Sequence, residues 1–121
     1  MINFEVDEPR RLLVIRYSGT VAAEETEKGL EDIRAGLARL KIGFRLLADL
    51  TALESMDVKC APFIERAMDL CNEKGASMVV RIIPDPHRDI GMSIMSIFHY
   101  RGDVEILTCE TLGQAEDLLK G

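Results

Sequence analysis

The chain has 121 residues, of which 47% are hydrophobic and 30% charged, and its formal net charge is -6. These values predict a single folded domain that buries one core without metal ions or disulfides. The negative charge would repel phosphates, so we exclude nucleic acid as a partner. No apolar stretch is long enough to cross a bilayer and the first residues lack a signal-peptide pattern, so we expect no membrane role.

The three cysteines are free thiols in this interpretation. Cys60, Cys71 and Cys109 are an odd number, without Cys-x-x-Cys spacing or paired histidines nearby. We therefore predict no disulfide framework, no metal and no cofactor. Cys60 and Cys71 would lie roughly 16 Å apart along one helix, which is too far to bridge. A reducing, cytoplasmic location fits this usage best.

The hydrophobic pattern predicts strands and helices that alternate after an initial hairpin. We expect strands at 3–7, 12–17, 44–48, 78–83 and 104–107, and helices at 21–40, between Asp57 and Gly75, at 85–99 and at 111–119. The order β-β-α-β-α-β-α-β-α predicts an α/β domain with four helices and a mixed, mostly parallel five-stranded sheet. The first strand would be added antiparallel at one edge.

Several residues predict how the helices begin and pack. Thr20 is a candidate cap for the first helix, and Thr111 with Gln114 forms a capping box for the last. Gly29 and Gly36 either weaken the first helix or permit close packing on the sheet. The last helix is expected to bury Leu112, Ala115, Leu118 and Leu119.

Ligands of such sheets collect where parallel strands end, and here two loops begin at those ends. Asp49 closes an apolar strand, and a polar loop then leads to Asp57. We predict that Asp49 accepts hydrogen bonds from loop amides and that Asp57 caps the second helix. The alternative is a cation or ligand held between the two carboxylates.

The second loop carries Asp85, His87 and Arg88 at the start of the third predicted helix. The favoured interpretation is a set of solvated first-turn residues around a cap. The alternative is an anion site, because helix amides and the helix dipole favour negative charge there.

These residues make the chain resemble the STAS family, the domain shared by anti-sigma factor antagonists and sulfate transporters. The order of elements matches over essentially the whole length. Locally, Leu-Ala-Asp49-Leu-Thr51 is followed eight residues after Asp49 by Asp57, where the family has Asp-Leu-Ser and then Asp-Ser-Ser-Gly. The resemblance implies a STAS-like fold and a regulatory, protein-binding role.

The chain departs from the family at the phosphoacceptor. In the phosphorylated members, the second serine after the aspartate accepts the phosphate, whereas this chain has Val58, Lys59 and Cys60 there. Lysine cannot accept phosphate from a serine kinase. The resemblance therefore implies a divergent, SpoIIAA-like branch without the usual switch.

Two further hypotheses concern the same loop. Thr51 and Ser55 carry its only hydroxyl groups, so each is a candidate displaced phosphoacceptor, with Ser55 first. Cys60, next to Lys59 at a helix start, is a candidate nucleophile with His87 as its base. The ordinary alternatives, which we favour, are solvated loop hydroxyls and a packed cysteine.

The third predicted helix has more apolar residues than its core stripe needs. Gly91, Met92, Met95 and Ser96 lie partly outside that stripe. Methionines in excess predict an adaptable surface for a second subunit, a partner helix or an apolar ligand. A helix that the fold buries on two sides is the alternative.

The leading prediction is a non-enzymatic STAS-like module that binds itself, as a homodimer, or another regulatory protein. A carrier of a small apolar ligand or lipid, with its pocket between the sheet and the third helix, is the second hypothesis. A small enzyme that uses Cys60 and His87 is the third.

Overall fold

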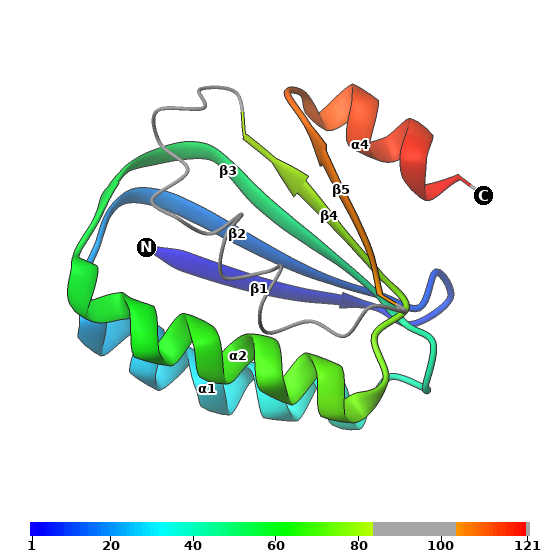
Figure 1. Cartoon of the computed structure of the whole chain (residues 1–121), viewed down its shortest axis with the longest axis horizontal. Helices are drawn as coiled ribbons and strands as arrows, with labels where there is room; N and C mark the ends of the chain where they lie inside the picture. The colour runs from blue at the N-terminus through cyan, green and yellow to red at the C-terminus, as the bar shows by residue number, and fades with distance from the viewer. Residues whose placement is uncertain (84–103, 121) are drawn as a thin grey trace.

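A computed structural model describes residues 1–83 and 104–120, which form a five-stranded sheet with helices against both faces (Figure 1). The strands are β1 (Ile2–Asp7), β2 (Leu12–Val21), β3 (Arg45–Met56), β4 (Met78–Ile82) and β5 (Glu105–Cys109). The helices are α1 (Ala23–Ala38), α2 (Ala61–Lys74) and α4 (Leu112–Leu119), and a short 3-10 helix, η1 (Val58–Cys60), precedes α2.

The sheet is mixed, and its strands follow the order β1-β2-β3-β4-β5. β1 pairs antiparallel with β2 at one edge, as predicted, and the other neighbours are parallel. The described residues contain three α-helices instead of the four that the sequence predicted. The remaining helix, which is the third in chain order and is expected at 85–99, lies outside the described residues.

The prediction that Thr20 caps the first helix is wrong. β2 continues to Val21, and α1 begins at Ala23 with Ala22 at the cap position and no side-chain cap bond. Gly19, with φ of 63°, lies at an irregularity in the pairing of β2 with β3. Glycine there permits a bulge within a strand, whereas in sequence it is typical of a turn.

β3 is also longer than predicted, since it runs to Met56 instead of ending near Ala48. The polar stretch after Asp49 is therefore a strand and not a loop. Its polarity arises because this part of β3 is largely solvent-exposed: Thr51, Glu54 and Ser55 are exposed, and Leu53 is buried.

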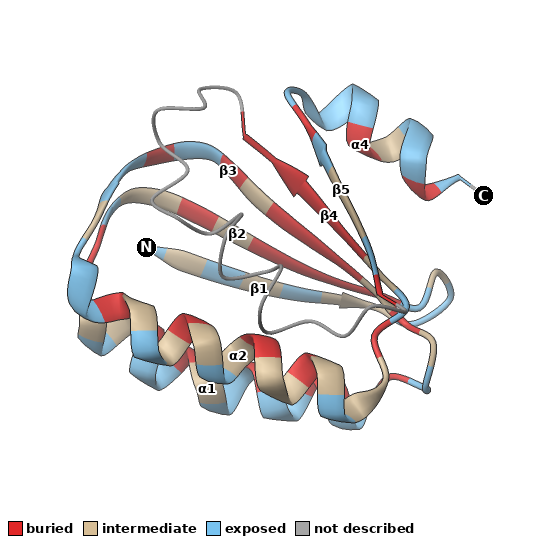
Figure 2. Ribbon diagram, in the orientation of Figure 1, coloured by how far each residue is buried: buried red, intermediate tan, exposed pale blue. Residues whose placement is uncertain are grey.

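Two hydrophobic clusters lie on opposite faces of the sheet (Figure 2). The larger one joins α1 and α2 to one face and includes Ile33, Ile64 and Met68. The smaller one places Ala115 and Leu119 of α4 against the other face. The expected burial of Leu112 and Leu118 is wrong, since their exposed fractions are 47% and 37%, respectively. The short α4 turns only a narrow stripe to the sheet.

Gly29 and Gly36 allow α1 to approach the sheet closely, which was one of the two predicted roles. A Cβ at Gly29 would lie 2.9 Å from Cζ of Phe4, and one at Gly36 would lie 3.1 Å from Cγ2 of Val6. Since ordinary van der Waals contact begins near 3.4 Å, these glycines set the distance between α1 and β1.

Replacing Gly29 with alanine tests this close approach. In an exposed helix the change stabilises by about 1 kcal/mol. Here we expect the free energy of unfolding to fall by about 1 kcal/mol, because the new methyl group overlaps the Phe4 ring. Urea denaturation measures the effect. In a Phe4→Leu background the loss should disappear, and an equal loss in both backgrounds would contradict the contact.

Candidate functional site

β2 and β3 continue past the end of β4 as a two-stranded parallel arm. We define the β2–β3 arm as residues 18–21 and 52–56, which follow the last pairing of β3 with β4 at Asp49 and Ile82. Figure 1 shows the arm curving toward the ends of α1 and α2 where these helices begin. Val21 and Leu53 are buried, whereas Thr20 and Ser55 on the arm are exposed. The arm therefore carries the chain from the sheet to η1.

Asp49 lies within β3, between Arg16 of β2 and Ile82 of β4. Its carboxylate accepts hydrogen bonds from the backbone amide of Thr51 at 2.9 Å and from the Thr51 hydroxyl at 2.5 Å. The predicted bond to a following amide is confirmed, although it forms inside a strand. The predicted strand end at Asp49 is wrong.

Asp57 caps the helical segment as predicted. Its backbone is extended, with φ of -63° and ψ of 136°, and its carboxylate accepts a 2.9 Å hydrogen bond from the amide of Lys59. The cap serves η1, which then continues into α2. This is the ordinary structural role of an aspartate at a helix start.

The alternative of one cation between Asp49 and Asp57 is excluded. Residues 49–56 belong to one strand, and a strand rises about 3.3 Å per residue, so the two carboxylates lie on the order of 20 Å apart. In the part of the chain that the structure describes, no three His, Cys, Asp or Glu side chains are placed to hold a metal.

The candidate phosphoacceptors Thr51 and Ser55 are both exposed. The Ser55 hydroxyl lies 3.1 Å from the Thr20 hydroxyl, so these two share a hydrogen bond across the arm. Thr51 is already bonded to Asp49. Exposure makes both hydroxyls accessible, and phosphorylation of either stays a prediction.

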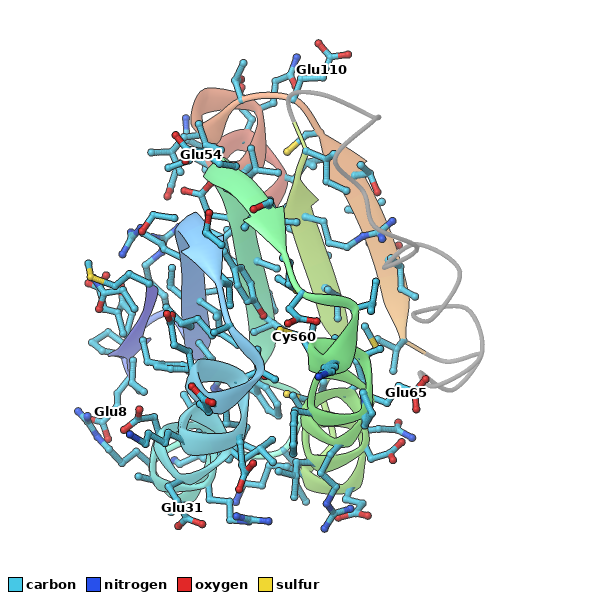
Figure 3. All side chains as sticks on the ribbon, turned by 90° about the vertical axis from the view of Figure 1, so that its left-hand side faces the viewer. Glu8, Glu31, Glu54, Cys60, Glu65 and Glu110 are labelled. Atoms are coloured by element: carbon cyan, nitrogen blue, oxygen red, sulfur yellow. The ribbon has the colours of Figure 1, made fainter. Side chains whose placement is uncertain are left out.

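Cys60 is a packed residue at the end of η1 (Figure 3). Only 1% of it is exposed, and its thiol donates a 3.7 Å hydrogen bond to the carbonyl of Val21. Lys59 beside it is exposed. A buried thiol has no access to a substrate, so its placement supports the packed interpretation and not the nucleophile.

Sequence reasoning missed the exposure of Val58, the residue directly after the cap. It is 79% exposed, and Pro62, four residues later on the continuous η1 and α2 segment, is exposed as well. Val58 and Pro62 are thus two exposed apolar residues at the start of this helical segment, and we call them the exposed apolar pair. Asp57 and Lys59 flank this pair. The sequence did contain a signal for this exposure, because Val58 is apolar at a position where the STAS family has serine.

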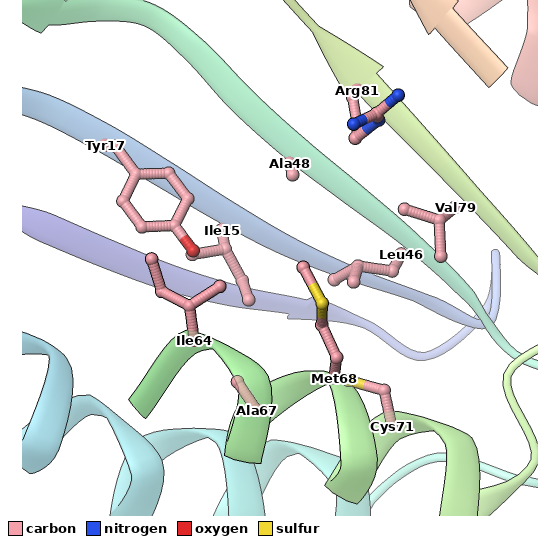
Figure 4. A pocket seen from close by; sticks show the side chains of 10 residues that line it. All are labelled: Ile15, Tyr17, Leu46, Ala48, Ile64, Ala67, Met68, Cys71, Val79 and Arg81. Atoms are coloured by element: carbon pink, nitrogen blue, oxygen red, sulfur yellow. The ribbon is translucent and has the colours of Figure 1, made fainter. Parts of the chain in front are cut away.

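A cavity of about 30 Å³ lies between the sheet and α2 (Figure 4). It is lined by Ile15, Tyr17, Leu46, Ala48, Ile64, Ala67, Met68, Cys71, Val79 and Arg81. The Tyr17 hydroxyl points toward Ile64 in Figure 4. Burial raises the pKa of Tyr17 far above its usual value, and the nearby thiols of Cys71 and Cys60 add to the increase.

A second buried thiol, Cys109, lies at the end of β5. Burial raises its pKa, a hydrogen bond with the backbone of Thr111 offsets part of this, and the charge of Asp49 raises it further. Cys71 is buried as well. All three cysteines are free thiols, as the sequence predicted.

Seven candidate residues lie outside the described residues and keep the status of predictions. They are Asp85, His87, Arg88, Gly91, Met92, Met95 and Ser96. Among residues 1–83 and 104–120, no helix has the length and apolar character needed to cross a membrane.

The cap can be tested at Asp57. Asp57→Ala removes the acceptor for the Lys59 amide, so we expect the free energy of unfolding to fall by about 1 kcal/mol in urea denaturation. Asp57→Asn keeps an acceptor oxygen and should lose less than about 0.5 kcal/mol. Equal losses in the two variants would show that the hydrogen bond is not the cause.

Tyr17 predicts a pH dependence of stability. Its pKa in the folded chain lies above the unfolded value of about 10, so the fold favours the neutral phenol. This contribution is complete below about pH 10 and is lost as the pH rises further, by up to about 1.4 kcal/mol per pH unit. Urea denaturation between about pH 8 and pH 11 measures it. Tyr17→Phe should flatten the alkaline fall, and an unchanged slope would contradict the assignment.

Comparisons with known proteins identify the fold. No family model matches the chain, and no curated protein matches it. An uncharacterised protein of the DUF3478 family from Shewanella loihica, with a SpoIIAA-like fold, is 19% identical, covers 98% of this chain and 92% of its own, and has a TM-score of 0.71.

Two further solved structures are similar over nearly their whole length. The phosphorylated form of the Bacillus cell fate determinant SpoIIAA is 16% identical over 99% of this chain and 100% of its own, with a TM-score of 0.66. An anti-sigma factor antagonist from Mycobacterium paratuberculosis is 17% identical over 100% and 96%, with a TM-score of 0.63. Identities this low show the fold alone, and the chain therefore has the SpoIIAA-like fold of a STAS-like domain, as its sequence resemblance implied.

Proposed function

We propose that the chain is a non-enzymatic regulatory module of the cytoplasm, which binds another protein through the exposed start of η1 and α2. The fold that it shares with anti-sigma factor antagonists supports a binding role. The third predicted helix, with Gly91, Met92, Met95 and Ser96, belongs to the same proposal as a further contact surface or a homodimer interface.

The observation that carries the proposal is the exposed apolar pair, Val58 and Pro62. Val58 is 79% exposed on a short, well-capped helical turn. A cap and a proline near the helix start hold this pair in one conformation. Binding of a partner would therefore cost little conformational entropy at these two residues. The charges of Asp57 and Lys59 beside the pair would supply the polar rim of such an interface.

Binding at this surface would not be switched by phosphate at the usual position. Lys59 stands where the family's phosphoacceptor serine is expected and carries a fixed positive charge. Ser55, on the arm that leads to this surface, is the first candidate for any phosphorylation, after which it could only accept, and no longer donate, in its hydrogen bond with Thr20. The module we propose therefore binds constitutively unless Ser55 or Thr51 is modified.

The second hypothesis, an apolar-ligand carrier, places its pocket between the sheet and the third predicted helix, outside the described residues, and it stays a prediction. The cavity under α2 is not that pocket, and it is too small to serve instead. Its volume is about 30 Å³, which holds one or two water molecules, whereas small-molecule pockets measure roughly 300 Å³ or more. The enzyme hypothesis receives no support from Cys60, because that thiol is buried.

Affinity capture from the source cells tests the binding surface with a matched pair of variants. Val58→Asp places a charge in the apolar pair. Ile42→Asp makes the same kind of change at a residue that is 78% exposed, in the turn before β3. We expect the specifically captured protein to bind the first variant at least about tenfold more weakly, as for a central interface residue, and to bind the second as it binds the unmodified chain.

The captured partner is then purified, and its affinity for the three chains is measured by isothermal titration. Mass measurement of the chain alone, over a range of concentrations, detects a homodimer in the same series of variants. Equal affinities for Val58→Asp and Ile42→Asp would overturn the proposed surface. Capture of no protein, together with a monomer that Val58→Asp does not change, would overturn the proposed function.

A further inference from the structure

A pocket lies where the β1–β2 turn meets the turn that follows α1. Its volume is about 420 Å³, within the range of roughly 300 to 1,000 Å³ that small-molecule sites occupy. Figure 1 shows these two turns at the end of the molecule opposite the β2–β3 arm. The pocket is lined by Glu8, Pro9 and Arg11 from the first turn and by Arg39, Leu40 and Lys41 from the second.

The charges that line this pocket are not balanced. Three of the lining side chains are cations, and among the described residues Glu8 is the only carboxylate beside them. Glu8 is already used, since it forms a 3.1 Å ion pair with Arg39. Neither Arg11 nor Lys41 has an ion-pair partner in the described part of the chain. Two positive charges are therefore left over in a chain whose net charge is -6, and they attract an anion.

The charged residues next to the pocket do not neutralise it. Asp7 and Arg10 precede and follow Glu8 and Pro9 in the same turn, but neither lines the pocket. The Asp7 carboxylate accepts a 3.3 Å hydrogen bond from the Arg10 amide, and the Arg10 side chain pairs with Glu116 of α4 at 2.8 Å. We define the pocket with its surplus of cations as the basic pocket.

Arg11 is held in the left-handed region of backbone conformation, with φ of 52°, and it is the one non-glycine residue with positive φ in residues 1–83 and 104–120. Glycine adopts this conformation without steric cost, whereas a residue with a Cβ does not. The dipole of α1 favours cations at Arg39 and Lys41, but it does not explain an arginine in the hairpin turn. A guanidinium that binds a ligand does explain it.

The turn that carries Arg11 is also fixed in place. Its carbonyl accepts a 2.7 Å hydrogen bond from the amide of Arg45 in β3, and its amide donates a 3.0 Å hydrogen bond to the Glu8 carbonyl. On the other side of the pocket, the Gly43 amide donates a 2.7 Å hydrogen bond to the Gly75 carbonyl. Both walls are therefore ordered before a ligand arrives, which lowers the entropy that binding costs.

We propose that the basic pocket binds the phosphate monoester group of a small molecule. Such a group carries close to two negative charges at about pH 7.5, which matches the two unpaired cations. The guanidinium of Arg11 bonds two phosphate oxygens, and the ammonium of Lys41 contacts a third as a point charge. The volume of the pocket leaves room for an organic group beside Pro9 and Leu40.

Three related anions test the ligand class in titrations followed by NMR at about pH 7.5. We expect phenyl phosphate to give saturable shifts at the amides of Arg11 and Lys41, with a dissociation constant on the order of 1 mM or lower. Phenyl sulfate has the same organic group but one negative charge, and it should bind about threefold more weakly. Inorganic phosphate should also bind more weakly, because it lacks the organic group. An affinity equal to that of phenyl phosphate would assign the pocket to free phosphate and overturn the organic ligand.

Variants of the two unpaired cations separate binding from folding. Arg11→Gly relieves the backbone, so the urea midpoint should stay equal or rise while the affinity for phenyl phosphate falls at least about fivefold. Lys41→Gln should weaken binding about threefold. Lys28→Gln removes the same charge at an exposed position that does not line the pocket, and it should change the affinity by less than about 1.5-fold. Equal weakening by Lys28→Gln would reduce the effect to net charge and overturn the site.

The remaining outcomes are also decisive. Shifts that do not saturate below about 20 mM, or that centre on Lys59 instead of Arg11, would overturn the basic pocket. A phosphoserine pentapeptide that binds at least about tenfold more tightly than phenyl phosphate would assign the pocket to a phosphorylated protein and overturn the small molecule. A dimer that phenyl phosphate dissociates and Arg11→Gly abolishes would assign it to an acidic surface of a second copy.

The basic pocket and the exposed apolar pair lie at opposite ends of the molecule, so the two proposals stand or fall separately. Val58→Asp should leave the affinity for phenyl phosphate unchanged, and Arg11→Gly should leave the affinity for the captured protein unchanged. Loss of phenyl phosphate binding in Val58→Asp would overturn the assignment of the anion to this pocket.

Discussion

The parallel pairing of β2 with β3 is the interaction on which the rest of the structure depends. It runs from Leu12 and Arg45 to Val21 and Met56, farther than any other pair of strands in the described sheet. At its end, the Asp57 amide donates a 3.1 Å hydrogen bond to the Val21 carbonyl, and the Cys60 thiol reaches the same oxygen. These two bonds fix the start of η1 to the sheet, and the exposed Val58 lies between the two residues that form them.

This pairing also explains why the two aspartates do not form one site. A loop after Asp49 would have allowed the chain to fold back and bring Asp57 close. A strand cannot do so, because its extended backbone separates residues in proportion to their number. Each carboxylate instead bonds a backbone amide two residues ahead. The chemistry of the region is therefore local capping, and the surface that we propose for binding is the apolar pair at the end of the arm.

The packing of α4, on the face of the sheet away from α1 and α2, depends on Arg45, the one charged residue in an apolar run. Arg45 donates one hydrogen bond to the Leu119 carbonyl at the end of α4 and another, at 2.9 Å, to the Arg10 carbonyl in the β1–β2 turn. Arg10 in turn forms a 2.8 Å ion pair with Glu116. A cation is favourable at the C-terminal end of a helix dipole. These contacts hold the short α4 over a face that its two buried residues, Ala115 and Leu119, cover only in part.

The sequence alone determined the features that depend on neighbours a few residues away. The cap at Asp57, the left-handed Gly75 that ends α2 and the Thr111 cap of α4 were all read correctly, since each bond or strain is local. Tertiary structure alone decided the length of β2 and β3, the contact of Gly29 with Phe4 and the partners of Arg45. In each case the interacting residues are distant in the sequence; Leu119, for example, lies 74 residues from Arg45. Exposed polar residues extend a strand when a paired neighbour satisfies their backbone, and no local pattern records that neighbour.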